Sequence, residues 1–325
     1  MLAYRPGSGL SVPYRALFAP LLSPVLWERR GNVPALAELL HSYIVRDISY
    51  ILSAGALPGV LGVFQKLLSS RANEAYAFRV LDSLLIACPT AAMSPFSPTA
   101  MQLLLQRLQD AVRDDRAAQQ PGEPARSAEC RNPRYVRRVL HTVAAYATAH
   151  GGVAATALLD SAQGAGSGLS VQVATGVWGR LRALLLIGPA AESRRIVAGL
   201  TRMLCESVLR DAPAAFVALL SLAVDIARTL GGTARPDDED TTAANDDSPE
   251  AREFDSSYSK LVYAGGPPDA ESDIVTGAKG YLPAQLATLC TGSAKGTCLT
   301  AVQALPQELQ QALQQLCQEA RVTLQ

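Results

Sequence analysis

The sequence predicts an all-α protein, and three observations support this fold class. Hydrophobic residues make up 49% of the chain but aromatic residues only 6%, so alanine and leucine, both strong helix formers, carry most of the packing. Apolar residues recur three and four positions apart over stretches of ten to twenty residues, the spacing of amphipathic helices. No run of alternating apolar and polar residues with a hairpin turn interrupts the series.

The predicted helices follow one another between corners marked by proline and glycine. In the stretch SPVLWERRGNVPALAELL, a charged corner precedes Asn32, which can cap the next helix, and Pro34 falls in the first turn, where its missing N–H breaks no hydrogen bond. The predicted helices span residues 33–46, 57–70, 72–89, 98–113, 133–149, 153–162, 169–187, 190–210, 213–230, 253–264, 280–291 and 306–320. Helix pairs about every 40 residues indicate a HEAT-repeat α-solenoid. An irregular helical bundle is the alternative.

Two stretches lack helical periodicity and divide the chain. Residues 113–132 mix proline, glycine and charge, and we expect an exposed loop there. Residues 232–252 are strongly acidic, and we expect a disordered linker, since such a segment buries too little apolar surface to offset its ordering entropy. The remaining parts are an unplaced N-terminal segment, 1–12, HEAT-like helical repeats over 13–231, and C-terminal helical repeats over 253–325.

The acidic linker holds the candidate protein-binding residues. Seven carboxylates lie within fourteen residues: Asp237, Asp238, Glu239, Asp240, Asp246, Asp247 and Glu250. Like charges at this density either form a solvated spacer or attract a basic partner, and the sequence leaves both interpretations open.

The sequence predicts no catalytic or metal site. Cys290 and Cys298 are eight residues apart, with no second pair and no histidine near them, so we expect two packed thiols rather than a zinc site. The three histidines, His41, His141 and His150, fall on separate predicted helix regions, and no nucleophile, base and orienting group come together. We therefore expect no enzyme.

Cofactors, nucleic acid and membranes are also not expected as partners. The glycine-rich stretches GAGSG and GSAKGT lack both the spacing and the preceding strand of a nucleotide-binding loop. The 29 basic and 29 acidic residues balance, so no basic footprint for nucleic acid stands out. The most apolar windows are too short or too polar to span a bilayer.

Several blocks of the sequence resemble a known family. The stretches LLSPVLWERRGNVPALAELL and LPGVLGVFQKLLSSRAN are similar to the C-terminal part of the importin-α export receptors, a family of the importin-β (karyopherin) superfamily. LLLQRLQ, SYSKLVYAGG and the tail LPQELQQALQQLCQEARVTL are similar to the same family, in the same order. The resemblance implies a HEAT-repeat superhelix in which Trp27 lies inside a tight corner. The alternative for Trp27 is an exposed contact aromatic.

The resemblance also implies a function and partners. Family members bind importin-α as cargo together with Ran·GTP, and shuttle between nucleus and cytoplasm. The family's N-terminal repeats, its main Ran-binding region, have no counterpart in this sequence, so the resemblance favours importin-α over Ran·GTP as a direct partner. A HEAT-repeat scaffold without transport activity is the alternative.

The first helix carries a further expectation. Its apolar residues lack a preceding repeat, so we expect an exposed strip and self-association. The residues of this expected strip are Tyr14, Leu17, Phe18, Leu21 and Leu22.

Overall fold

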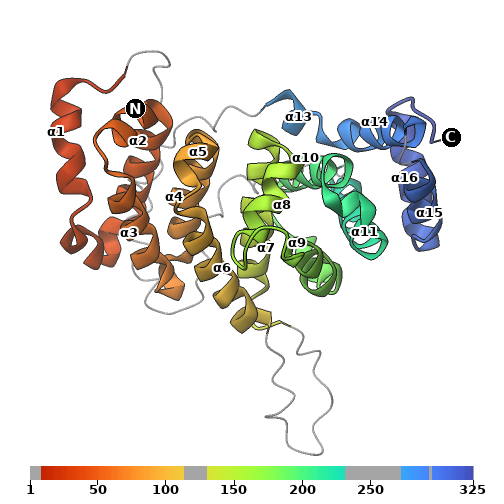
Figure 1. The fold of residues 1–325 in the computed structure, drawn as a ribbon, viewed down its shortest axis with the longest axis horizontal. Coiled ribbons are helices and arrows are strands. Elements are labelled where there is room, and N and C mark those ends of the chain that lie inside the picture. Colours follow the sequence, from red (N-terminus) through yellow and green to blue (C-terminus); the bar gives the residue numbers. More distant parts are fainter. Residues whose placement is uncertain (1–8, 113–129, 231–271, 293–294, 325) are drawn as a thin grey trace, which may run out of the picture. The chain divides into compact units, whose positions relative to one another are not determined.

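The computed structural model describes residues 9–112, 130–230, 272–292 and 295–324. The chain divides into two compact units, whose described parts are residues 9–95 (unit 1) and the described residues from Phe96 onward (unit 2). All regular structure in these described residues is helical, which confirms the predicted all-α class (Figure 1). The predicted helix 253–264 and the acidic linker 232–252 lie outside the described residues.

Unit 1 contains the first helices of the chain. They are α1 (Val12–Leu21), η2 (Pro24–Glu28), η3 (Arg30–Asn32), α2 (Val33–Ser53), α3 (Leu57–Leu68), η4 (Arg71–Asn73), α4 (Glu74–Ala87) and α5 (Thr90–Met93), where η marks short non-α helical turns. Both α2 and α3 pack against α4, while α1 packs against α2. Leucine, valine and phenylalanine side chains fill the core between these helices.

A break inside α2 explains why its periodicity ended early in the sequence. The predicted helix stops at residue 46, and Asp47 has non-helical backbone angles, φ −149° and ψ 60°. One last helical segment then runs to Ser53. The Asp47 Oδ1 atom accepts a hydrogen bond from the backbone N–H of Tyr50 at 3.1 Å, so Asp47 caps this segment as Asp commonly caps helix starts.

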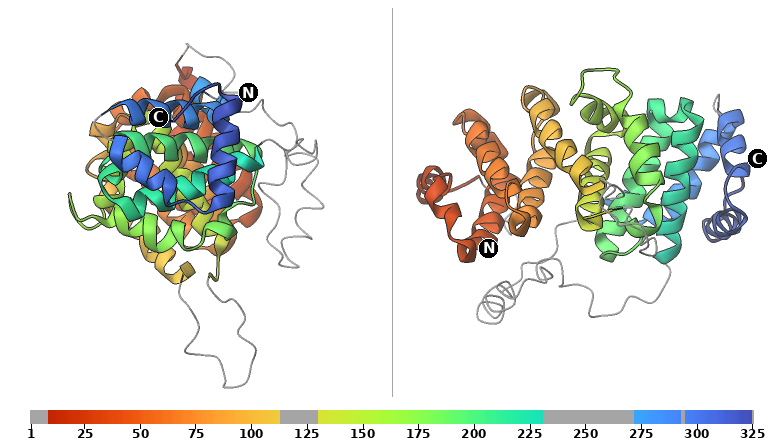
Figure 2. Two further views of the ribbon diagram at one scale, coloured as in Figure 1. Left: turned by 90° about the vertical axis from the view of Figure 1, so that its right-hand side faces the viewer. Right: turned by 90° about the horizontal axis from the view of Figure 1, so that it is seen from below.

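Unit 2 contains the remaining described helices. They are α6 (Ser97–Val112), α7 (Pro133–His150), α8 (Gly152–Asp160), α9 (Leu169–Val173), the π-helix η6 (Ala174–Gly179), the 3-10 helix η7 (Arg182–Leu185), α10 (Ala190–Glu206), η8 (Val208–Asp211), α11 (Pro213–Thr229), α13 (Asp273–Thr276), α14 (Ala278–Thr291), α15 (Lys295–Gln303) and α16 (Gln307–Glu319). Helix α10 is central, because α7, α8, α11 and α14 all contact it (Figure 2).

The single helix predicted over residues 169–187 was wrong. The structure divides this stretch into α9, a π-helical turn and a 3-10 turn. Gly176 and Gly179 weaken helix formation there, and the guanidinium group of Arg137 on α7 donates a hydrogen bond to the carbonyl oxygen of Leu185. A tertiary contact of this kind cannot be read from local periodicity. The short helices α5, α13 and α15 were also not predicted.

Candidate functional site

The seven candidate binding residues of the acidic linker lie outside the described residues. They are Asp237, Asp238, Glu239, Asp240, Asp246, Asp247 and Glu250. The structure neither places them nor tests their role, so they stay a prediction. The site built below comes from the described part of the chain.

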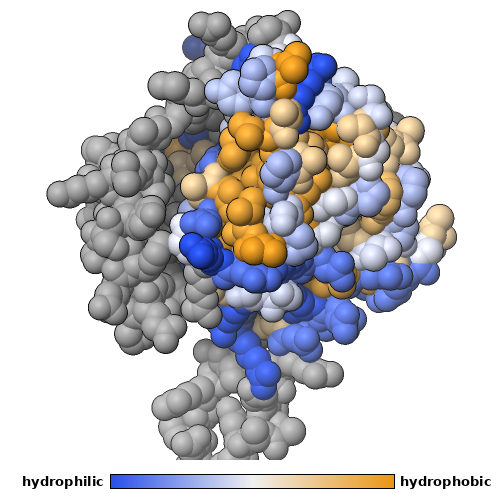
Figure 3. Space-filling model, turned by 90° about the vertical axis from the view of Figure 1, so that its left-hand side faces the viewer, coloured by the Kyte–Doolittle hydropathy of each residue, from blue (hydrophilic) through white to orange (hydrophobic). Residues whose placement is uncertain are grey.

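Unit 1 exposes a cluster of large apolar side chains on α1 and η2. Five such side chains fall within residues 12–26 and define what we call the α1–η2 face: Val12, Tyr14, Leu17, Val25 and Leu26. Val12 is 80% exposed, Val25 67% and Leu17 59%. Figure 3 shows an apolar area on the side where α1 lies. Contiguous apolar surface of this kind commonly marks a protein-interaction site.

Part of the predicted strip is buried, which corrects that prediction. Phe18 and Leu21 are only 2% and 4% exposed. The Phe18 ring lies 5.2 Å from the ring of Tyr43 and 5.9 Å from that of Tyr50. Tyr14 and Leu17 are exposed as expected. Tyr14, Leu17, Phe18 and Leu21 share one face of α1 by their spacing, which does not show which of them a neighbouring helix will cover.

Trp27 lies inside the corner, as the resemblance implied. Its side chain is 3% exposed, and its indole Nε1 donates a hydrogen bond to the carbonyl oxygen of Leu21 at 2.8 Å. This bond ties η2 back onto the end of α1. From the other side, Lys66 of α3 donates to the carbonyl oxygen of Pro24 at 2.8 Å and pairs with Glu28 at 3.3 Å. The backbone that carries Val25 and Leu26 is therefore held in place by neighbouring elements.

Two tyrosines of α2 hold the backbone of α1. The hydroxyl of Tyr43 donates to the carbonyl oxygen of Tyr14 at 2.7 Å, and that of Tyr50 donates to the carbonyl oxygen of Arg15 at 3.2 Å. The Arg15 guanidinium lies 4.9 Å from the centre of the Tyr50 ring, within the range of a cation–π contact.

The Asp47 carboxylate adds a third attachment between α1 and α2. It accepts a hydrogen bond from the backbone N–H of Leu10 at 3.0 Å and pairs with Arg15 at 3.1 Å. Burial alone would raise the pKa of Asp47, but the hydrogen bonds from Leu10, Tyr50 and Arg15 outweigh burial and lower this pKa. The α1–η2 face thus rests on a fixed backbone, which reduces the ordering entropy that a partner must overcome.

In unit 2, two buried charged side chains hold the segment that contains η7. The buried Arg137 donates to the carbonyl oxygen of Leu185 and, at 2.9 Å, to the Ser193 hydroxyl, and it lies 3.6 Å from Glu192. From α11, the buried Asp225 pairs with Arg182 at 3.0 Å.

These contacts hold the segment from both sides, and the side chain of Ile187 just beyond it is 86% exposed. A single exposed isoleucine is common on protein surfaces and defines no site by itself.

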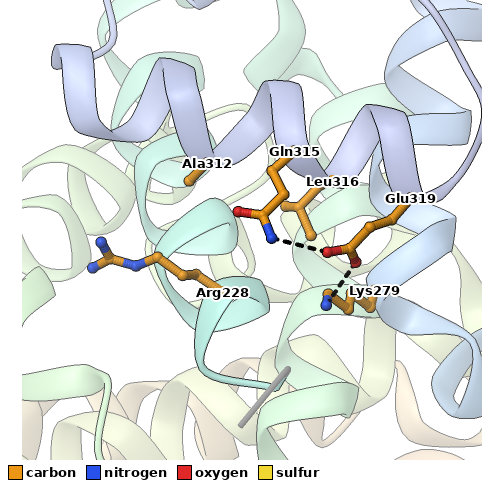
Figure 4. A pocket seen from close by; sticks show the side chains of 6 residues that line it. All are labelled: Arg228, Lys279, Ala312, Gln315, Leu316 and Glu319. Carbon is orange, nitrogen blue, oxygen red and sulfur yellow. Dashed lines mark hydrogen bonds and ion pairs between the residues drawn. The ribbon is translucent and has the colours of Figure 1, made fainter.

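A small cavity of about 200 Å³ lies between α11, α14 and α16 (Figure 4). Its charged side chains are already paired: Lys279 with Glu319 at 2.7 Å, and Arg228 with Asp225 at 3.0 Å. The Lys279 ammonium and the Gln315 amide donate hydrogen bonds that lower the pKa of Glu319. Because both cations are neutralised locally, the cavity provides no unpaired charge to orient an anionic ligand.

The two cysteines discussed for a zinc site pack together as free thiols, as predicted. Cys290 and Cys298 are both buried, with their Sγ atoms 2.9 Å apart. Across the residues that the structure describes, no group of three or more His, Cys, Asp or Glu side chains is placed to hold a metal ion. No described helix combines the length and apolarity that crossing a membrane would require.

These features define a class of protein before any relative is named: an all-helical protein that exposes apolar side chains on α1 and η2. A solved structure titled "The exportin Cse1 in its cargo-free, cytoplasmic state" has the same fold. It aligns with a TM-score of 0.69 over 95% of this chain and 29% of that chain, at 23% identity. The predicted HEAT-repeat α-solenoid fold is therefore confirmed.

A family model and individual proteins then show that the chain is similar to exportin-2. Residues 1–117 match the family model described as "CAS/CSE protein, C-terminus". The chain is 46% identical to exportin-2 of Homo sapiens over 99 residues, which cover 30% of this chain and 10% of that relative. It is 27% identical to exportin-2 of Danio rerio over 325 residues, which cover 97% of this chain and 30% of that relative.

The chain is therefore similar to the C-terminal part of exportin-2 along nearly its whole length. It spans less than a third of the length of these relatives, 10% to 30% by the two alignments.

Proposed function

We propose that this chain acts in nuclear transport, as the C-terminal HEAT-repeat region of an exportin-2-type receptor. The observation that carries the proposal is the similarity to exportin-2 over 97% of the chain, which agrees with the fold match to Cse1. The proposed cargo is importin-α, carried from the nucleus to the cytoplasm, and the resemblance favours it over Ran·GTP as the direct partner of this chain. The scaffold alternative is not favoured, because the relatives are exportins, which are transport receptors.

The acidic residues have a specific role in this proposal. The importin-α cargo that the resemblance implies carries a basic segment, and the seven carboxylates between Asp237 and Glu250 have no basic residue among them. They steer this basic segment toward the receptor rather than anchoring it. Electrostatic attraction between exposed groups chiefly raises the association rate and weakens with salt.

Binding of importin-α by the whole chain, with and without Ran·GTP, tests the function. We expect importin-α to be retained, and association at low salt to slow several-fold when Asp237, Asp238 and Asp240 become Asn and Glu239 becomes Gln. The dissociation rate should change little. The matched control neutralises Asp273 and Glu308, two exposed carboxylates of unit 2, and should leave association unchanged.

The possible results separate the two parts of the proposal. No retention of importin-α under either condition would refute the transport function. Retention with equal association rates for all three proteins would refute steering alone, and the acidic segment would then be a spacer.

A further inference from the structure

We infer that Cys290 and Cys298 form an oxidation site, at which hydrogen peroxide converts the two thiols into a disulfide that locks α15 onto α14. The site contains none of the acidic residues proposed to steer cargo, and it does not depend on cargo binding. Three features of unit 2 support it: the distance between the two sulfur atoms, the burial of both side chains and the light attachment of α15.

The two sulfur atoms lie close to bonding distance. The Cys290 thiol points at the Cys298 sulfur, and their Sγ atoms are 2.9 Å apart. The bonded distance in a disulfide is about 2.05 Å, so a movement of about 0.9 Å, shared between two side chains, closes the gap. Cys290 lies in the last turn of α14 and Cys298 in the first turn of α15. The bond would therefore join the two helices directly.

Helix α15 is only lightly anchored to unit 2. Its nine residues pack against α14 and α11, and Cys298 and Ala301 are its buried residues. Helix α10, in contrast, buries every residue from Ile196 to Thr201. Elements with few buried contacts open locally at the lowest cost in free energy. Opening of α15 gives a small, neutral peroxide access to Cys298, whose side chain is 0% exposed in the closed form.

The oxidation proceeds in two balanced steps. In the open form the Cys298 sulfur attacks one oxygen of hydrogen peroxide, the O–O bond breaks, and the hydroxide released takes up the thiol proton as water. This step leaves a sulfenic acid on Cys298. When α15 closes, the Cys290 sulfur attacks the Cys298 sulfur, the S–O bond breaks, and hydroxide leaves with the Cys290 proton as a second water. The two thiols together lose two electrons, which the peroxide gains.

Burial makes the first step slow and the second step fast. It raises the pKa of the Cys298 thiol, so the reactive thiolate is scarce. Once the sulfenic acid exists, Cys290 is held beside it, and this proximity gives a high effective concentration. The closed form also keeps out further peroxide, so the disulfide forms before the irreversible sulfinic acid. The site therefore responds to sustained oxidation rather than to a brief pulse.

Two other cysteines are rival partners for Cys290. Burial raises the pKa of Cys205 on α10 and of Cys317 on α16, and Cys290 contributes to both increases, so its sulfur lies near both thiols. Cys298 is favoured over them because its sulfur is in direct contact with that of Cys290. The experiment must separate these three pairings.

The test oxidises the reduced full chain with hydrogen peroxide under native conditions, blocks the remaining thiols and digests the chain with trypsin without reductant. Cleavage after lysine and arginine places Cys290 on the peptide 280–295 and Cys298 on the peptide 296–321. Because the second peptide also contains Cys317, the variant Cys317→Ala is digested in parallel. In both proteins we expect the two peptides to stay linked, with a mass two hydrogen atoms below their sum, and to separate after reduction.

Hydrogen exchange of the α15 amides gives a second measurement. We expect oxidation to slow this exchange at least about fivefold, because the disulfide prevents local opening. Cys290→Ala should abolish both the link and the slowing. The matched control is Cys88→Ala, which removes a buried thiol of unit 1 and should leave both unchanged. Oxidised and reduced forms of the same variant are compared, so a change in basal stability does not affect the result.

The remaining outcomes would overturn the inference. They are intact thiols after sustained oxidation, sulfinic or sulfonic acid at Cys298 without a link, and a link from Cys290 to Cys205. Loss of the link in Cys317→Ala would make Cys317 the partner and overturn it as well. A correct link that leaves the exchange of α15 unchanged would refute the lock.

Discussion

Gly199 of α10 lies against the backbone of Ala144 of α7 so closely that a Cβ atom at position 199 would overlap the Ala144 carbonyl group. Gly152, at the start of α8, faces the carbonyl group of Arg202 on α10 in the same way. Helix α10 therefore contacts two neighbouring helices through glycine, at a separation that no other residue permits. This close packing lies at the centre of unit 2.

The substitution Gly199→Ala should destabilise unit 2 by about 3 kcal/mol, because overpacking at a backbone contact forces whole helices apart. The measurement is the urea midpoint followed by circular dichroism. The control is Gly280→Ala within α14, where a new Cβ meets no atom within 4 Å. Alanine there should stabilise by up to about 1 kcal/mol, as expected for its helix propensity. Equal midpoints for the two variants would contradict the close contact.

Replacing Trp27 by Phe should destabilise unit 1 by about 2 kcal/mol, since it removes a buried hydrogen bond and leaves a small cavity. The carbonyl oxygen of Leu21 would lose its indole donor. The thermal midpoint by circular dichroism measures this loss. Tyr14→Phe, on the exposed face, is the control for aromatic substitution and should change the midpoint little. A neutral Trp27→Phe variant would show that the corner does not depend on the indole group.

Acidification should weaken the attachment of α1 through Asp47. The pKa of this carboxyl is lowered in the folded state, so its stabilising contribution is fully present above the unfolded pKa, about 4, and is lost as the pH falls through the lower folded value. Asp47→Asn should lower the urea midpoint at neutral pH. The difference between the variant and the original chain should then shrink as the pH falls below about 4. A difference that stays constant down to pH 2 would contradict this assignment.

Alkaline pH should weaken unit 2 through two thiols, the half-buried Cys205 and the buried Cys298. Burial raises the pKa of Cys205 to about 12, with Glu206 and Cys290 contributing, and burial also raises the pKa of Cys298. An unfolded thiol ionises near pH 8.5. The contribution of these neutral thiols to the stability of unit 2 is therefore fully present below that pH. It declines as the pH rises toward the pKa of the thiols in the folded state. We expect the urea midpoint to fall above about pH 9, and to fall less steeply in Cys205→Ala. Identical pH profiles would exclude Cys205 as a cause.

Much of the fold could be predicted because helix starts and stops are local. Pro34 and Pro133 fall in the first turns of α2 and α7, and Asn132 caps α7 by accepting from the Tyr135 N–H at 3.1 Å. The break up of residues 169–187 was missed, because it depends on contacts from α7 and α11 that only the folded chain brings close.

The candidate site was only partly predictable for a similar reason. The apolar residues of α1 were found, but Phe18 and Leu21 were expected to be exposed and are buried. Val25 and Leu26 were missed, because η2 is too short to show a helical period. The acidic residues from Asp237 to Glu250 lie outside the described part of the chain, and their role stays a prediction.

The two tryptophans of this chain give each compact unit its own optical reporter. Trp27 belongs to unit 1 and Trp178 to unit 2, and both are buried. In a variant that keeps only one of them, the intrinsic fluorescence follows a single unit as denaturant is added. Two coincident curves would mean that the units unfold as one cooperative system, and two separated curves would mean that each unit melts independently.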